Sequence, residues 1–500
     1  MKPLALLQGL GVSAFVLFRL YGSSIAHPSD LRMRTPVPLT NFALSILANL
    51  ILTGIVLAFL GQWIGSSHKF QWLRFALPGV LLALLVKVVG SNLNVEVRPA
   101  LLIAVFLGVT FLAVMLHRKS PRGEQIVSNL TKAILLGMGI FFLIVTVQLV
   151  RVAMWRPYPN FVDTLPAANT APDSHPRIVW ILFDELSYQQ VFGDRFPNLQ
   201  LLNFDALRAS STIFTQARPV ADYTELAIPS ILLGKIIKRV SFTSGDRLNV
   251  GAATGPLYPF DAAQTAFAST RKNGLATGVV GWYNPYCSSL SPYLNLCFRM
   301  GTNEEDIPQD YGVLDGFWKD FTVPWRHYLV DASHSKRKHW LIIRHAATYR
   351  KLLQQSDRAL KDPNLDFLFI HLPIPHPPGI YNRETKQFDT SGNRSYIDNL
   401  ALADRTLGQL MALLQLSPRW KNTDVIVCGD HSWRTWHWSP RPTWTAEDAA
   451  ASHGGIYDPS PMLMIHLAGQ TTPATVSTPY SLLVVHSILN DLANGKNPSY

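Results

Sequence analysis

The chain has 500 residues, of which 48% are hydrophobic and only 15% are charged. Soluble proteins usually contain about 25% charged residues, so this composition argues against an entirely soluble protein. The formal net charge is +11, but the basic residues do not form tracts that could follow a phosphate backbone, which argues against nucleic-acid binding. Three cysteines are too few for a disulfide scaffold. The sequence therefore predicts a large protein with a membrane part.

Five apolar stretches in the first third of the chain are candidates for membrane-spanning helices. A hydrocarbon core about 30 Å thick needs roughly 20 apolar residues in helical form. The stretches are Pro3 to Tyr21, Phe42 to Ile64, Phe75 to Gly90, Leu101 to Leu116 and Ala133 to Trp155. Lys87 interrupts the third and the fourth is short, so either could tilt or re-enter. A cleaved signal peptide is an alternative for the first, although Arg19 and Tyr21 resemble an interfacial end.

The distribution of basic residues predicts the orientation, because positively charged loops tend to stay in the cytoplasm. The segment HRKSPRGEQ, after the fourth stretch, carries Arg118, Lys119 and Arg122 and is expected to be a cytoplasmic loop. Arg32 and Arg34, after the first stretch, argue for the opposite orientation but are fewer. With five spans in a plasma (inner) membrane, the remainder of the chain would lie outside the cytoplasm.

Residues 156–176 contain five prolines and no helical period, which indicates a linker. We therefore expect a transmembrane domain (1–155), a linker (156–176) and a catalytic domain (177–500). In the last of these, short apolar runs alternate with helical stretches, which is typical of βαβ units. Because the runs are apolar almost throughout, we predict an α/β domain with a mostly parallel sheet covered by helices on both faces. The candidate strands are Arg177 to Phe183, Leu275 to Gly281, Asp366 to Leu372, Asp424 to Gly429 and Met462 to Leu467.

Acidic and histidine side chains follow several of these strands. They are Asp184 and Glu185 after the first strand, His371 and His376 at the third, Asp430 and His431 after the fourth, and His453 before the last. Alone, each has a structural explanation as a helix cap or a packing residue. Together they favour a ligand site, because ligands bind beyond the carboxyl ends of parallel strands. Carboxylates with imidazoles suit Zn²⁺ or Mn²⁺, whereas a site built from oxygen alone would favour Ca²⁺ or Mg²⁺.

Five short segments in a particular order carry a resemblance to a known family. They are ILFDELS, DYTELAIPSILLGK, the PHPP turn, SYIDNLALADRTLGQLMALL and GDHSW. With these segments, the chain from Arg177 to about Ala493 resembles the alkaline phosphatase superfamily in its sulfatase-like branch. That branch includes membrane-anchored sulfatases, lipoteichoic acid synthases and lipid A phosphoethanolamine transferases. The synthases and transferases also join five membrane helices to an external catalytic domain.

The resemblance implies a metal site and a nucleophile. Asp184, alone or with Glu185, would bind a divalent metal together with Asp430 and His431. Thr224 would be the nucleophile, because it stands five positions before Pro229, as in the transferases, and begins a predicted helix. A threonine hydroxyl is a weak nucleophile until a metal lowers its pKa.

Two points about these assignments remain open in the sequence. Thr224 could instead be a simple helix cap, and its neighbours Tyr223 and Glu225 could shift the register by one. The resemblance also implies that His376 and His453 contact the transferred phosphoryl group or bind a second metal.

Two departures from the family patterns bear on the substrate. Ala227 stands where sulfatases carry the Cys or Ser that becomes formylglycine, which argues against a formylglycine sulfatase. The segment HLPIPHPP looks more like the sulfatase turn than the transferase turn, and DHSW replaces the more usual Asp-His-Gly.

The cysteines and tryptophans allow further expectations. Cys287 and Cys297 flank a short loop and could form a disulfide in an oxidising compartment or remain two reduced packing residues. Cys428, inside a predicted strand, is expected to be a core residue. Tryptophans crowd the segment after His431 and could form either a lipid- or sugar-binding rim or ordinary packing.

The leading hypothesis is a metal-dependent membrane enzyme that transfers or hydrolyses a phospho-substituted group through a covalent phospho-threonine. The donor would be a membrane phospholipid and the acceptor an envelope glycolipid or glycan, with no nucleic acid as partner. One alternative is a sulfatase-like hydrolase of sulfate or phosphate esters. Another is a catalytically inactive membrane partner for envelope assembly.

Overall fold

The chain forms two compact units. The computed structural model describes residues 3–26, 39–66, 73–92, 99–119, 121–154, 161–164, 176–243, 247–301, 312–314, 316–318, 321–322 and 334–498. The first unit comprises Met1–Arg156 with Ile307–Ala332, and the second comprises Pro157–Asp306 with Ser333–Tyr500. The segment Ile307–Ala332, which we expected in the catalytic domain, therefore groups with the first unit. Asn49 Nδ2 donates a hydrogen bond to the carbonyl oxygen of Phe317 at 3.0 Å, which ties part of this segment to a helix.

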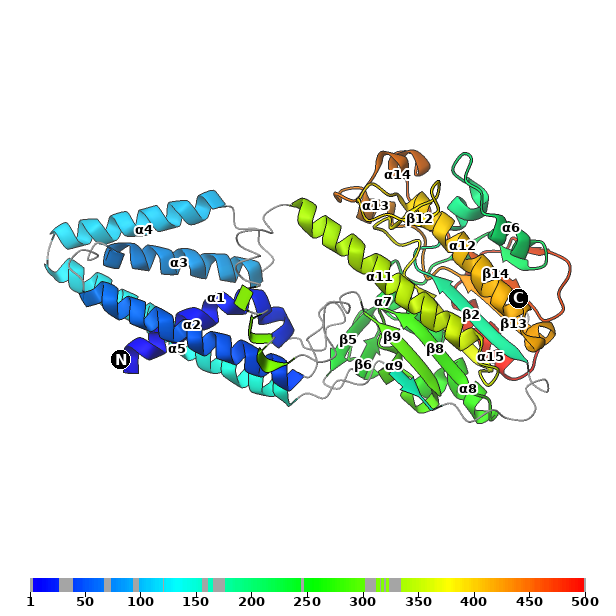
Figure 1. The fold of residues 1–500 in the computed structure, drawn as a ribbon, viewed down its shortest axis with the longest axis horizontal. Helices are drawn as coiled ribbons and strands as arrows, with labels where there is room; N and C mark the ends of the chain where they lie inside the picture. The colour runs from blue at the N-terminus through cyan, green and yellow to red at the C-terminus, as the bar shows by residue number, and fades with distance from the viewer. Residues whose placement is uncertain are drawn as a thin grey trace. The chain divides into compact units, whose positions relative to one another are not determined.

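Five long helices form the first unit, one for each apolar stretch of the sequence (Figure 1). They are α1 (Pro3–Ala26), α2 (Leu39–Ser66), α3 (Leu73–Asn92), α4 (Pro99–Lys119) and α5 (Pro121–Ala153). Helices α1, α2 and α5 share an apolar core that includes Ala14, Ile46, Leu50, Val145 and Leu149. Small residues allow close packing: a Cβ added to Gly9 would lie 2.2 Å from the carbonyl oxygen of Gly54, so α1 and α2 approach closely there.

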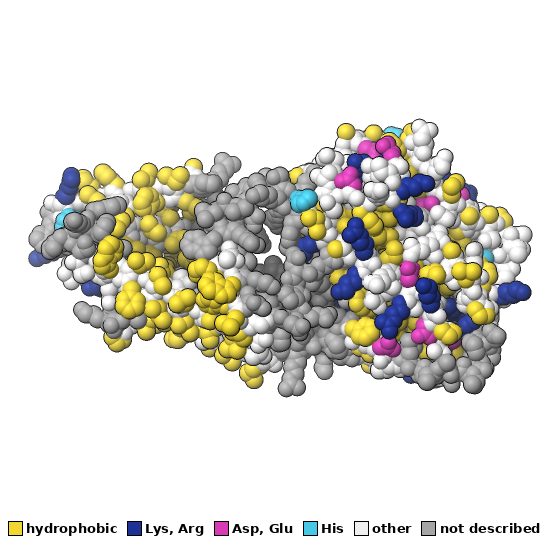
Figure 2. All heavy atoms as spheres, viewed as in Figure 1, with side chains coloured by type: hydrophobic (Ala, Val, Ile, Leu, Met, Phe, Trp, Pro, Cys, Tyr) yellow, Lys and Arg dark blue, Asp and Glu magenta, His cyan; other side chains and the backbone are white. Residues whose placement is uncertain are grey.

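Among the described residues, three helices are long and apolar enough to cross a membrane. They lie at Thr40–Trp63, Ala100–Arg118 and Gln125–Ala153, with mean hydropathies of 2.4, 2.5 and 2.5. Large apolar side chains on them are exposed, such as Phe59, Phe111 and Val147, and Figure 2 shows hydrophobic side chains over this unit. Lipid would cover such side chains without the cost of exposing them to water.

Helices α1 and α3 do not meet this criterion, so the expected count of five spans is not confirmed. Their apolar parts, Pro3–Leu17 and Phe75–Val86, are shorter. The side chains of Lys87, Arg19 and Tyr21, on which part of the expectation depended, lie outside the described residues, as do Arg32 and Arg34.

The basic segment predicted as a loop between the fourth and fifth spans is largely helical. Helix α4 ends at Lys119 and α5 begins at Pro121, so Arg118 and Arg122 both lie in helices. Proline is tolerated at the first position of a helix because its missing N–H would have no intrahelical partner there. A new helix can therefore begin almost where the previous one ends.

A nine-stranded sheet is the centre of the second unit. Its strand order is β1-β9-β8-β10-β2-β13-β14-β3-β15, and every pairing from β9 to β13 is parallel. The strands are β1 (Phe161–Asp163), β9 (Leu296–Met300), β8 (Thr277–Trp282), β10 (Phe367–Leu372), β2 (Arg177–Phe183), β13 (Thr423–Cys428), β14 (Leu463–His466), β3 (Thr212–Phe214) and β15 (Ala474–Val476). The predicted α/β fold with a mostly parallel sheet is confirmed.

Helices cover both faces of this sheet, which explains why the central strands read as continuous apolar runs. Val179 and Ile181 of β2 pack in one core with residues of α11 (His334–Leu360) and α12 (Tyr396–Gln415). Trp180 and Leu182, which alternate with them, pack in a second core with α7 (Thr224–Leu233), α8 (Ala266–Lys272) and α15 (Val484–Ala493). Figure 1 shows α11 and α12 crossing one face of the sheet. Successive strand residues point to opposite faces, so one strand serves both cores.

Shorter elements surround this frame. They are α6 (Leu202–Arg208), β4 (Ala217–Arg218), β5 (Arg239–Thr243), β6 (Arg247–Gly251), β7 (Tyr258–Pro259), α9 (Tyr286–Ser289), β11 (Tyr381–Asn382), β12 (Gln387–Phe388), α13 (Thr435–Trp438), α14 (Ala446–Ala451) and β16 (Tyr480–Ser481). Strand β1 lies inside the predicted linker and pairs antiparallel with β9, so that part of the linker is ordered by the sheet; residues 155–160 and 165–175 lie outside the described residues.

The cysteines occupy two different environments. A disulfide joins Cys287 of α9 to Cys297 of β9. Cys428 is fully buried in β13, where its Sγ accepts a hydrogen bond from Trp180 Nε1 at 3.2 Å. It is a packing residue of the core.

Candidate metal centre and nucleophile

Three adjacent parallel strands position the candidate site. In the register of the sheet, Leu182 of β2 pairs with His371 of β10 on one side and with Cys428 of β13 on the other. Because neighbouring strands lie about 4.8 Å apart, side chains just beyond these pairs must lie close together. Asp184 follows β2, and Asp430 follows β13.

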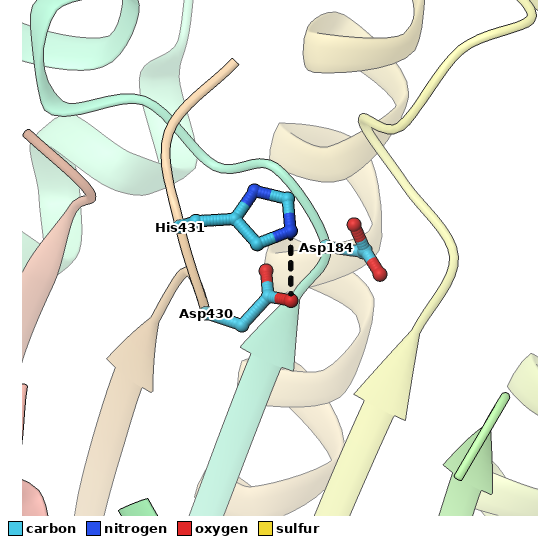
Figure 3. Close-up of side chains that lie close together, drawn as sticks. All are labelled: Asp184, Asp430 and His431. Atoms are coloured by element: carbon cyan, nitrogen blue, oxygen red, sulfur yellow. Dashed lines mark ion pairs between the residues drawn. The ribbon is translucent and has the colours of Figure 1, made fainter. Parts of the chain in front are cut away.

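Asp184, Asp430 and His431 converge at this edge. Each offers one ligand atom, and these atoms all lie within 4.8 Å of one another. Figure 3 shows His431 and Asp430 on the segment after one strand, facing Asp184 beyond the next, with the dashed line marking the 3.2 Å contact between His431 Nε2 and Asp430 Oδ2. All three side chains are fully buried. We call these three residues the metal cluster.

The electrostatics of the metal cluster fit a bound cation. Burial raises the pKa of the Asp184 carboxyl well above its usual value, and the charges of Asp430 and Glu185 raise it further. Asp184 Oδ1 and Asp430 Oδ2 are buried without a hydrogen-bond partner among the described residues. A buried carboxylate oxygen without a partner is unfavourable, because burial removes its hydration and nothing replaces it. A divalent cation would compensate both, and two carboxylates with one imidazole suit such an ion.

Thr224 places a hydroxyl at the metal cluster. It is the first residue of α7 and only 6% exposed. Its Oγ1 donates a hydrogen bond to Asp184 Oδ2 at 3.1 Å and lies 3.4 Å from His431 Nε2. The preceding residue, Tyr223, makes no side-chain capping bond to the helix. The amide dipoles at the start of α7 therefore point toward the Thr224 hydroxyl. They favour a negative charge at that place.

Glu185 stands beside Asp184 but makes different contacts. Its φ of 62° is in the left-handed region, which is uncommon for a residue other than glycine. Two contacts hold this conformation: its N–H donates to Asp430 Oδ1 at 3.2 Å, and its carbonyl oxygen accepts from Tyr396 Oη at 2.8 Å. The backbone turn at Glu185 thus connects the segment that carries Asp184 to the segment that carries Asp430.

The carboxylate of Glu185 is bound by an arginine and a tryptophan. Arg434 donates to it through Nε at 2.7 Å and also through a terminal guanidinium nitrogen. Trp438 Nε1 donates to its two oxygens at 3.1 and 2.9 Å. Asp184, Glu185 and His376 form a second group that could hold a metal, but Arg434 already compensates the charge of Glu185. The charge of Arg434 also acts on Asp184, but its guanidinium donates hydrogen bonds to Glu185 and to the carbonyl oxygen of Asp222.

We expect Glu185→Gln to reduce stability more than metal binding. The change would leave the buried guanidinium of Arg434 without its charged partner, which costs about 3 to 5 kcal/mol. The thermal midpoint of the purified full chain should fall, while its metal content, measured by elemental analysis, should match that of the wild type. Loss of the metal with little change in the thermal midpoint would show instead that Glu185 is a ligand.

Besides His431, the sequence singled out three histidines, and these lie in different environments. His371 is fully buried, and burial is the main cause that lowers its pKa to about 4. Its Nδ1 lies 2.7 Å from Tyr286 Oη and its Nε2 lies 3.5 Å from Asp184 Oδ2. His376 Nε2 is 3.9 Å from Glu185 Oε1, and burial, followed by the charge of Arg434, lowers its pKa well below the usual value. Both imidazoles are therefore neutral at pH 7.

His453 lies apart from both groups of candidate ligands. Its exposed side chain pairs with Asp194 Oδ2 at 2.6 Å. His453, Gly454 and Gly455 all have positive φ angles, so the chain makes a tight turn here with the side chain at the surface. The resemblance implied that His453 contacts the transferred phosphoryl group or binds a second metal, whereas the structure pairs its imidazole with Asp194.

The sequence did not identify the arginine of the site. Arg434 follows His431 by three residues and lies in the tryptophan-rich segment. Those tryptophans divide into two kinds: Trp433 and Trp438 are buried, Trp433 stacking on Tyr396 with ring centroids 4.2 Å apart, whereas Trp436 is 43% exposed. No local signal in the sequence indicates that Arg434 pairs with Glu185, because the two residues are 249 positions apart.

Comparisons with known proteins identify the family of the second unit. A family model described as Sulfatase matches residues 176–448, more than half of the chain. No curated protein matches the sequence at a significant level.

Several solved structures are similar to the chain at low identity. Ps i-CgsB in complex with k-i-k-neocarrahexaose is 16% identical, with 65% of this chain and 73% of that chain covered and a TM-score of 0.39. The phosphonate monoester hydrolase of Agrobacterium radiobacter is 13% identical, with 64% and 74% covered and a TM-score of 0.38. A protein in the alkaline phosphatase superfamily from Vibrio parahaemolyticus is 13% identical, with 68% and 72% covered and a TM-score of 0.35.

Proposed function

The chain belongs to the sulfatase family, and from this premise we propose that it is a metal-dependent membrane enzyme that transfers a phospho-substituted group through a covalent intermediate on Thr224. The observation that carries the proposal is the position of the Thr224 hydroxyl. It lies 3.1 Å from Asp184 Oδ2 and 3.4 Å from His431 Nε2, at the start of α7. A helix cap alone would not require a hydroxyl beside two buried carboxylates that each have one oxygen without a hydrogen-bond partner among the described residues.

Asp184, Asp430 and His431 would hold the divalent metal. Zn²⁺ and Mn²⁺ suit this mixture of carboxylates and imidazole better than Ca²⁺ or Mg²⁺, which prefer oxygen ligands alone. When bound, the metal would lower the pKa of the Thr224 hydroxyl and neutralise the oxygens of the substrate.

The residues of the chain would carry out the transfer in two displacements. In the first, Thr224 Oγ1 forms a bond to phosphorus and the bond from phosphorus to the leaving alcohol breaks. The leaving alcohol takes the proton that the threonine hydroxyl loses. The amide dipoles at the start of α7 stabilise the anionic phospho-substituted group. The neutral imidazole of His376 lies near the metal cluster and could donate a hydrogen bond to the same phospho-substituted group.

The apolar helices of the first unit and the disulfide of the second unit support a lipid donor and an outer compartment. The three apolar helices support membrane association, and a membrane anchor would keep the enzyme in the membrane that contains its phospholipid donor. The disulfide between Cys287 and Cys297 suits an oxidising compartment. We therefore place the catalytic unit outside the cytoplasm, on a multi-pass plasma (inner) membrane protein with an envelope glycolipid or glycan as acceptor.

A sulfatase-like hydrolase of sulfate or phosphate esters is the second candidate, favoured by the family match. In that case water would accept the group from Thr224. An inactive partner protein is disfavoured because Asp184, Asp430, His431 and Thr224 are all present and brought together.

Trapping of the intermediate tests the proposal. The full chain, loaded with Mn²⁺ or Zn²⁺, is mixed with vesicles of phosphatidylglycerol or phosphatidylethanolamine and quenched in acid. We expect peptide mass spectrometry to find a phospho-substituted adduct on Thr224 at early times, with diacylglycerol as co-product. Accumulation of diacylglycerol with an unmodified Thr224 at every time point would overturn the covalent mechanism.

A further inference from the structure

A cavity lined by both polar and apolar side chains adjoins the segments that carry the metal cluster and the nucleophile. Its volume is about 170 Å³, and the lining includes Gln190, Ser432, Trp433, Thr435, Tyr457 and Asp458. We propose that this cavity, here called the acceptor cavity, binds a neutral hydroxylated group, such as a sugar ring or a polyol, as the acceptor of the transfer. This inference rests on the proposed function and names the class of acceptor.

Three residues that line the acceptor cavity are neighbours of residues of the site, in sequence or through a hydrogen bond. Ser432 follows the ligand His431, and its carbonyl oxygen lies 3.0 Å from His431 Nδ1. Ser187, also in the lining, stands two residues after Glu185. Tyr457 Oη donates to Asp222 Oδ1 at 2.6 Å, and Asp222 stands two residues before Thr224. A group held here would therefore lie beside the loops that hold the reacting atoms.

Four lining side chains carry polar atoms that need partners. Within the described part of the chain, Gln190 Oε1, Ser432 Oγ, Trp433 Nε1 and Thr435 Oγ1 make no hydrogen bond, although each residue is more than nine-tenths buried. Each such atom costs about 1 to 3 kcal/mol when it stays unpaired. Four of them around one cavity are not expected of simple packing. These atoms are buried beneath the surface of the cavity, and small side-chain rotations would bring them to the hydroxyl groups of a bound ligand.

The charges and size of the acceptor cavity indicate a small, uncharged ligand. Its lining contains the carboxylates of Asp194 and Asp458 and no lysine or arginine. Asp194 is paired with His453, whereas Asp458 Oδ1 accepts from the backbone N–H of Ser460 at 2.8 Å. An anion would be repelled, while hydroxyl groups could donate to these oxygens. The cavity is smaller than the roughly 300 to 1,000 Å³ of sites for larger ligands, so it fits one ring or a short polyol.

The chemistry of the second displacement fits a hydroxyl held at this place. The oxygen of the acceptor hydroxyl forms a bond to phosphorus, and the bond between phosphorus and Thr224 Oγ1 breaks. The proton that the acceptor loses passes to Thr224, which is restored as an alcohol. A hydroxyl bound beside the loops has an advantage over water because its position is already fixed.

Binding of neutral glycosides tests the inference without turnover. The full chain is placed in nanodiscs, free of glycoside detergents, and stripped of metal so that an anion cannot bind to the metal cluster. Saturation-transfer NMR then measures binding of glycerol, methyl glucoside, methyl galactoside and methyl N-acetylglucosaminide, with glucuronate as the anionic comparison. We expect at least one neutral probe to bind at least about tenfold more tightly than glucuronate.

Variants of the lining locate the binding site. Thr435→Val and Gln190→Leu should each weaken binding of the neutral probe about three- to tenfold, because each removes one hydrogen-bonding group. Thr471→Val, at an exposed threonine outside the lining, is the matched control and should bind as the wild type does. A Thr435→Ser variant should restore the affinity.

The outcomes separate this inference from the proposed function. If Thr224 is modified by the donor but none of the neutral probes binds, or binding is unchanged in Thr435→Val and Gln190→Leu, the acceptor cavity is not the acceptor site. If a neutral probe binds and both variants weaken it while Thr224 is never modified, the cavity has the predicted ligand and the covalent mechanism fails. With metal and phospholipid present, the probe should also become phospho-substituted, about three- to tenfold less in either variant.

Discussion

Thr224→Ala is expected to lower the rate of diacylglycerol release from phospholipid by at least about 10³-fold. Without Oγ1 there is no atom to form the bond to phosphorus, and only direct attack by water within the site remains. The hydroxyl makes a single hydrogen bond of normal length, to Asp184, so its loss should cost stability only about 0.5 to 1.5 kcal/mol. The variant should therefore fold and bind metal while losing turnover.

Two further variants separate the nucleophile from a structural role. Thr224→Ser keeps the hydroxyl and should retain activity within about tenfold, whereas Thr224→Val keeps the shape and should be as inactive as the alanine variant. Thr265→Val is the matched control, because Thr265 is also buried at the start of a helix and its hydroxyl donates to Ala262 at 2.7 Å. Full turnover in Thr224→Val would show that another group is the nucleophile.

The sequence predicted the central strands well because each is buried on both faces. Five apolar runs correspond to β2, β8, β10, β13 and β14, with boundaries that differ by at most two residues. The parallel order of the inner strands then brings their carboxyl ends together, so Asp184 and Asp430 could be placed at one edge from the sequence alone. The short strands at the two edges of the sheet, such as β1 and β15, have no apolar run of this kind and were missed.

The partners of Glu185 could not be predicted from its position in the sequence. Adjacent acidic residues suggest shared ligation of one metal. The structure instead pairs Glu185 with Arg434, which is 249 residues away, and a left-handed backbone turn makes this possible. A contact between residues so distant depends on how the loops pack after the sheet has formed. The surface position of His453 similarly depends on a tight turn that its own residue type does not indicate.

The membrane part shows a different limit of sequence reasoning. Each apolar stretch became a helix, because helical hydrogen bonding is available to any long apolar run. Helix ends were less predictable: α5 begins at Pro121, twelve positions before the expected Ala133. The polar first turns of α5 are helical because they continue the hydrogen bonding of its apolar part. A hydropathy pattern does not detect such polar turns.

Asp430→Asn is expected to weaken metal binding by at least about 100-fold. Asp430 Oδ2 has no hydrogen-bond partner among the residues described and lies 3.2 Å from His431 Nε2. The amide keeps the size of the side chain and can still accept the N–H of Glu185, but it removes one of the two carboxylates of the metal cluster. Removing a residue that only hydrogen-bonds a metal ligand already lowers metal affinity about 10- to 100-fold. Removing a ligand itself should therefore lower the affinity by at least the larger factor.

Metal affinity should also depend on pH in a direction set by Asp184. Burial and the neighbouring carboxylates raise its pKa in the metal-free protein, so protons compete with the metal at higher pH than for an ordinary aspartate. Binding should therefore release protons, and affinity should fall as the pH is lowered. Competition with a chelating dye at several pH values, using the full chain, measures both effects.

Asp424→Asn provides the matched control for the metal measurement. Asp424 is also buried and lies in the same strand, β13, but toward its other end, where Oδ1 accepts the N–H of Ala468 at 2.8 Å. Its amide variant should bind metal as the wild type does.

Metal at 100 times its dissociation constant should raise the free energy of unfolding of the wild type by about 2.7 kcal/mol, and Asp430→Asn should lose most of this gain. If Asp430→Asn and Asp424→Asn were to bind metal equally well, the cation would have to lie elsewhere, and Thr224 would have no metal to activate it.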